Sequence, residues 1–129
     1  MDKNLEETVN LWLIKAENDM KTASQLFDAK EIITDTICFH CQQAAEKYLK
    51  AYLVSKNIEP DKTHKLEILL TKCMEFEPAF EDIKDVRYIT EYAVELRYPD
   101  DFYIPTVTEA REAYALADMV KVFVLKLLY

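Results

Sequence analysis

Glycine is absent from all 129 residues of this chain. Phosphate-binding P-loops and dinucleotide-binding turns need glycine so that the backbone can approach a phosphate, and both motifs are therefore excluded. Two-residue β-hairpin turns also depend heavily on glycine. We therefore expect an all-helical domain, in which four prolines and the polar residues form the loops.

Long apolar runs, an export signal and a basic surface are missing as well. No run approaches the roughly 20 apolar residues that cross a bilayer, and residues 1–4 open a polar, acidic segment. We expect one cytoplasmic domain, residues 1–129, with no membrane contact. The net charge of −8 argues against sequence-independent binding of DNA or RNA by a general basic surface, although it leaves room for a local basic cleft.

The cysteines are too few for a disulfide framework or a zinc site. Cys38, Cys41 and Cys73 cannot all pair, and free thiols are the default without an export signal. Cys38 and Cys41 can share one helix face, but zinc usually needs four ligands and no second cysteine pair exists. The sequence therefore predicts buried packing cysteines, no metal and no cofactor.

Apolar residues recur every three or four positions along most of the chain, which is typical of amphipathic helices. The pattern predicts helices over residues 5–29, 34–56, 64–74 and 78–96, and a last one that follows a capping box at 106–109. Asn4, with Glu7 three residues later, is the expected cap of the first helix. The predicted fold is an up-and-down bundle of four main helices plus one short helix.

The second helix has an apolar arc of about half its circumference, wider than that of a surface helix. It should pack on more than one neighbour, and one of these can belong to a second subunit. Its polar arc consists of His40, Gln43, Glu46, Lys47 and Lys50. From spacing alone, a solvated face with a Glu46–Lys50 pair is favoured, and an anion-binding strip is the functional alternative.

Two further places carry candidate ligand-binding residues, each with a structural alternative. His64 can contact a ligand at a helix start, or it can simply hydrogen-bond to a neighbouring carbonyl. Arg97 can recognise phosphate or carboxylate, with Tyr98 stacking on a base. Alternatively, Arg97 clamps the loop through a salt bridge to Asp100 or Asp101, and spacing alone does not decide between these readings.

Three blocks of the sequence together resemble the HEPN family. They are FHCQQAAEKYLKAYLV (39–54), KTHKLEILL (62–70) and ELRYPDDF (95–102), and the resemblance covers nearly the whole chain. It implies a compact helical bundle that is usually a homodimer. Many small prokaryotic members are encoded beside a minimal nucleotidyltransferase, and the pair often behaves as a toxin–antitoxin system.

Active members of that family are metal-independent RNases whose motif is an arginine, four to six residues, and a histidine. Arg97 matches the arginine, but the three positions at which the histidine is expected hold Phe102, Tyr103 and Ile104. We therefore assign no catalytic residue. The resemblance favours a non-catalytic dimer that binds a nucleotide, RNA or a partner protein. The candidate ligand-binding residues are Arg97, Tyr98, Asp100, His64, Lys47, Lys50 and Gln43.

Two alternatives to that reading stay open. One is an RNase with a degenerate motif, whose rebuilt site uses Arg97 and His64, with Tyr103 as a further candidate. The other is a purely structural dimer, formed through the apolar face of the second helix.

Overall fold

The computed structural model describes residues 1–92 and 103–129, and predictions that fall on 93–102 lie outside it. The described residues form helices and no strand. The helices are α1 (Lys3–Phe27), α2 (Thr34–Ser55), α3 (Leu66–Phe76), the 3-10 helix η1 (Pro78–Tyr92) and α4 (Val107–Leu128). The predicted all-α bundle is confirmed.

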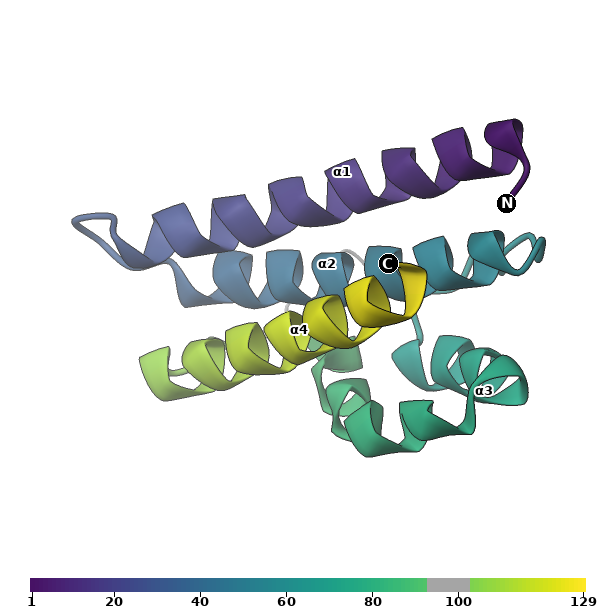
Figure 1. Cartoon of the computed structure of the whole chain (residues 1–129). Coiled ribbons are helices and arrows are strands. Elements are labelled where there is room, and N and C mark those ends of the chain that lie inside the picture. The colour runs from purple at the N-terminus through teal and green to yellow at the C-terminus, as the bar shows by residue number, and fades with distance from the viewer. Residues whose placement is uncertain (93–102) are drawn as a thin grey trace.

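Helix α2 is the central element of the bundle. Helices α1, α2 and α4 run alongside one another, and α3 and η1 lie together on one side of them (Figure 1). Helix α2 contacts all four other helices. Packing on several neighbours is thus confirmed, and helices of the same chain suffice to cover the wide apolar arc.

The main core is assembled around α2. Its fully buried residues there include Ile37, Cys38, Cys41, Ala44, Ala45, Tyr48, Leu49 and Leu53. All three cysteines are buried and free, as predicted. Burial raises the pKa of each thiol to about 12, because the low-dielectric interior disfavours the thiolate. Among the described residues, no helix is long and apolar enough to cross a membrane.

Helix α1 begins two residues earlier than predicted. Its N-cap is Asp2, whose carboxylate accepts hydrogen bonds from the backbone N–H of Asn4 at 2.7 Å and of Leu5 at 3.2 Å. The prediction of Asn4 as the cap is wrong. Aspartate caps as well as asparagine does, and the upstream residue of the two takes the position.

Helix α3 begins at Leu66, and not at His64 as predicted. The main-chain carbonyl of His64 accepts a hydrogen bond from Gln42 on α2 at 2.8 Å. Lys65, the N-cap, is extended, with φ −84° and ψ 109°. The tie between His64 and α2 therefore keeps this stretch outside the helix.

The segment predicted as the fourth helix is a 3-10 helix, broken at Ile83, where φ is −115° and ψ is 18°. Its inward face includes Ile89, which is buried, whereas Tyr88 is exposed. Helical periodicity alone allows either Tyr88 or Ile89 to face inward, and the structure selects Ile89. The capping box before α4 is confirmed, because Thr106 and Glu109 exchange both of its hydrogen bonds. Helical spacing from Val120 and Val124 predicts that Leu127 faces inward on α4, but this residue is 40% exposed.

Candidate functional site

The candidate residues that the structure describes lie on one side of α2 and in the loop before α3. Gln43, Lys47 and Lys50 are on α2, and His64 precedes α3 by two residues. The other candidates, Arg97, Tyr98 and Asp100, lie outside the described residues. Two charge clusters organise the described part.

The first cluster joins α1 to α2 through Asp19. One oxygen of its carboxylate lies 2.8 Å from Nδ1 of His40, and the other accepts a hydrogen bond from the Lys47 ammonium at 2.5 Å. Asp19 is buried, and its two partners are half-buried. The lysine charge on this part of the polar arc is therefore already paired.

The second cluster is centred on Glu46, which is only 3% exposed. One carboxylate oxygen lies 2.8 Å from Nδ1 of His64, and the other accepts a hydrogen bond from the Lys50 ammonium at 3.0 Å. Lys50 is itself 7% exposed. The expected Glu46–Lys50 pair exists, but the prediction of a solvated face is wrong for these two residues, since Trp12 of α1 and the loop before α3 lie over them.

Two glutamines extend the second cluster. Gln42, fully buried, donates to the His64 carbonyl at 2.8 Å and to Glu46 at 3.4 Å. Gln43 donates in turn to the side-chain carbonyl of Gln42 at 2.6 Å. Every buried side-chain nitrogen and oxygen in the described ranges has a hydrogen-bond partner. The network is thus fully satisfied, which a buried polar group requires.

Each cluster contains one carboxylate, one lysine and one histidine. With neutral histidine each sums to zero, and with protonated histidine each carries one positive charge. The charge of Lys47 and the charge of Lys50 are thus each balanced by a buried carboxylate within the cluster.

A groove of about 530 Å³ lies beside the second cluster, at the end of the bundle where α1 begins and α2 ends. The Lys50 ammonium sits 5.6 Å from the centre of the Trp12 ring. The groove is lined by Leu5, Thr8, Trp12, Lys50, Val54 and the residues from Asn57 to Lys62. Its volume falls within the usual range of small-molecule sites, roughly 300–1,000 Å³.

Sequence reasoning missed Asp19 and Gln42, although each carries a recognisable signal. Asp19 follows Ala16 by three residues and therefore falls on the inward face of α1. Gln42 lies within the apolar arc of α2, between Leu49 and Leu53 in angle. A polar residue on a buried face needs a partner, and this rule predicts that both make specific contacts.

The fold is a small helical bundle whose second helix carries a row of polar residues. This is the kind of domain that the three sequence blocks indicated. The family model described as HEPN domain matches residues 9–127, and the chain belongs to the HEPN family. No curated protein and no solved structure matches the chain.

Proposed function

We propose that this HEPN protein is a nucleotide-binding homodimer that does not cleave RNA. The observation that carries the proposal is the loss of the motif histidine after Arg97, since the only two histidines of the chain are His40 and His64. In the structure, each of these is held by a buried carboxylate. The proposed ligand-binding residues remain Arg97, Tyr98, Asp100, His64, Lys47, Lys50 and Gln43.

Tyr103 occupies one of the positions at which the family motif places its histidine. Its hydroxyl donates to Glu109 at 2.6 Å, and this hydrogen bond raises the tyrosine pKa. A phenol with a raised pKa stays protonated at neutral pH and makes a poor base. Tyr103 therefore does not replace the histidine, which supports binding over catalysis.

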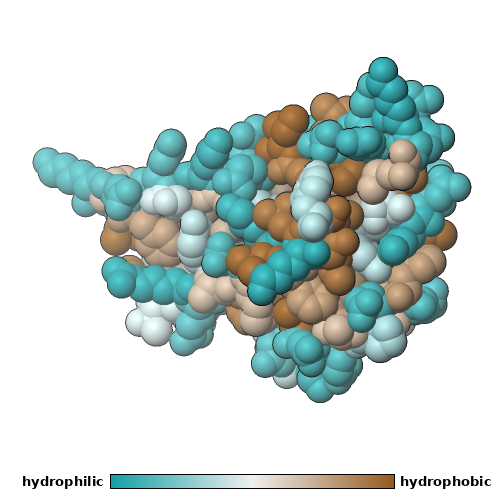
Figure 2. Space-filling view, in the orientation of Figure 1, coloured by the Kyte–Doolittle hydropathy of each residue, from teal (hydrophilic) through white to brown (hydrophobic). Residues whose placement is uncertain are grey.

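A homodimer is supported by the family, whose domains commonly dimerise, and by the surface. Leu11 and Ile14 on α1 are 60% and 56% exposed, and Val122 on α4 is 45% exposed. Apolar patches are visible among hydrophilic residues near the middle of the face that carries α1 and α4 (Figure 2). Contiguous exposed apolar surface typically marks an interface, and we assign this face to the second copy.

A minimal nucleotidyltransferase is the proposed partner of the dimer, in a toxin–antitoxin-like pair in the cytoplasm. The support is the resemblance of the three sequence blocks to small family members encoded beside such an enzyme. The gene next to the one that encodes this chain is the observation to make. A neighbouring nucleotidyltransferase that co-purifies with the dimer supports the pairing, and a neighbour of another class contradicts it.

The proposal is tested with labelled RNA and labelled ATP. Purified protein in EDTA should leave RNA intact, as should an Arg97→Ala control, while equilibrium dialysis detects bound ATP. RNA cleavage that disappears in Arg97→Ala would overturn the non-catalytic assignment and direct attention to His64. If the protein neither cleaves RNA nor binds ATP, the purely structural dimer is the remaining hypothesis.

A further inference from the structure

The buried Glu46 cluster holds the partly exposed His64 in a fixed position. Glu46, Lys50 and Gln42 are all more than nine-tenths buried, and burying charge is costly unless the geometry is well satisfied. Glu46 holds the ring of His64 through Nδ1, and Gln42 holds its main-chain carbonyl. The ring and the main-chain carbonyl of His64 are therefore both held in place by side chains of α2.

The same arrangement leaves the other ring nitrogen of His64 available. The side chain is 40% exposed, and within residues 1–92 and 103–129 its Nε2 makes no hydrogen bond. A carboxylate on Nδ1 favours the tautomer with a proton on that atom. Nε2 is thus presented as a contact atom for a polar or anionic ligand.

His64 does not line the groove described above, but it is linked to the groove through Lys50 and Lys62. Lys50 lines the groove and shares the Glu46 carboxylate with His64. Lys62, two residues before His64, lines the groove as well. It is exposed and has no ion pair among the described residues. A positive charge therefore lies on the groove wall, two residues along the chain from the oriented histidine.

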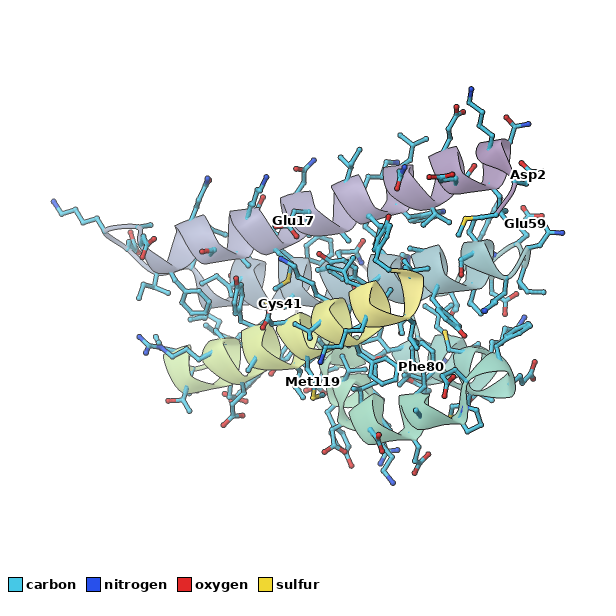
Figure 3. All side chains as sticks on the ribbon, in the orientation of Figure 1. Asp2, Glu17, Cys41, Glu59, Phe80 and Met119 are labelled. Atoms are coloured by element: carbon cyan, nitrogen blue, oxygen red, sulfur yellow. The ribbon has the colours of Figure 1, made fainter. Side chains whose placement is uncertain are left out.

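The rest of the groove suits a nucleoside. Trp12 lines the groove with a partly exposed ring, one face of which is turned to the Lys50 ammonium, and aromatic rings stack on bases. Glu59, labelled in Figure 3 at the same end of the molecule as Asp2, supplies a carboxylate that can accept hydrogen bonds from hydroxyl or amino groups. The other acidic residue of the lining, Asp61, pairs with Lys72 at 3.1 Å, so its charge is compensated.

We infer that this groove is the nucleotide site, with the base against Trp12 and the phosphate held by Lys62 and Nε2 of His64. The inference rests on the proposed nucleotide binding, keeps His64 and Lys50 from the residues proposed above, and adds Trp12 and Lys62. It places the phosphate at the loop between α2 and α3, on residues that the family's RNase motif does not include.

The sole tryptophan of the chain provides a direct readout. Titration with AMP should quench Trp12 fluorescence saturably, whereas inorganic phosphate should leave it nearly unchanged. His64→Asn keeps a side-chain N–H where Nδ1 meets Glu46 and removes Nε2. It should weaken AMP binding about tenfold, as loss of one charge-assisted hydrogen bond does, with an unchanged melting temperature.

Lys62→Ala and Lys65→Ala form a matched pair of exposed lysines on the same loop, of which only Lys62 lines the groove. Lys62→Ala should weaken AMP binding about tenfold, and Lys65→Ala should leave it within about twofold. If His64→Asn fails to fold, Lys62→Ala still tests the proposed nucleotide site.

The outcomes separate this site from the proposed function. Suppose that calorimetry detects AMP binding, but Trp12 fluorescence does not change and neither His64→Asn nor Lys62→Ala alters the affinity. This result would overturn the assignment of the nucleotide site to the groove and leave nucleotide binding intact. No binding of any nucleotide to the wild-type protein would overturn both.

Discussion

Tyr48 is the residue at which the three long helices meet. Its buried hydroxyl donates to Glu17 of α1 at 2.9 Å, and Glu17 also pairs with Lys121 of α4 at 2.9 Å. Figure 3 shows Glu17 on α1 facing toward α2 and α4. Burial, followed by the Glu17 contact, raises the pKa of Tyr48, so the hydroxyl stays a donor at every physiological pH.

Glu17→Gln should destabilise the fold at neutral pH. The hydrogen bonds from Lys121 and then Tyr48 lower the pKa of Glu17 against the opposing effect of burial. A carboxyl whose folded pKa is lowered stabilises above its unfolded pKa, about 4.5, and loses that contribution as the pH falls through the folded value.

We expect a cost of about 1 kcal/mol at pH 7, kept modest because this carboxylate is partly exposed to solvent. Urea unfolding of wild type and Glu17→Gln at pH 7 and pH 3 measures it, with exposed Glu7→Gln as the control. A difference from wild type that persists undiminished at pH 3 would contradict the ionic explanation.

The thiols should be inert in the folded protein. Burial raises the pKa of Cys38, Cys41 and Cys73 to about 12, and the thiolate is the reactive form. With Ellman's reagent at pH 8, the native protein should show almost no rapid reaction, and denatured protein should show all three thiols. Fast reaction of one thiol in native protein would show that its site opens readily.

At the scale of elements, the capping box of α4 offers a clean test of local stability. Thr106 accepts from the backbone N–H of Glu109 at 3.0 Å, and alanine removes this hydroxyl together with the γ-methyl of an exposed residue. Thr106→Ala should cost about 1 kcal/mol of unfolding free energy. Thr108→Ala, an exposed threonine in the same helix turn, is the control and should cost clearly less in chemical denaturation. Equal losses would show that helix propensity, and not the cap, sets the effect.

Element type was predictable here, whereas tertiary contacts were not. Helical spacing located α2 and the capping box of α4, because both signals are local. The tight winding of η1, with its break at Ile83 and Ile89 turned inward, depends on packing against the rest of the chain.

The candidate site shows the same division. His64, Lys47 and Lys50 were identifiable as polar residues at informative positions. Asp19, the partner of Lys47, lies on the facing helix α1. Glu46, the partner of Lys50 and His64, lies on α2 itself and is buried in the folded protein. Spacing along one helix does not reveal which residue of another element faces it.

At the scale of the whole molecule, the apolar face shared by α1 and α4 should form the dimer. Ile14→Glu places a charge on that face, which is strongly unfavourable in a desolvated interface. Sedimentation should show a dimer for the wild type and a monomer for this variant. Ile68→Glu, at a partly exposed isoleucine on α3, is the control and should remain dimeric. A dimeric Ile14→Glu protein would move the interface elsewhere.

The central claim is that the protein binds a nucleotide, and titration calorimetry of the wild-type protein with ATP in EDTA tests it most directly. We predict a saturable heat with one nucleotide per protomer. Absence of heat with millimolar ATP, from protein whose circular dichroism shows it folded, would contradict the account.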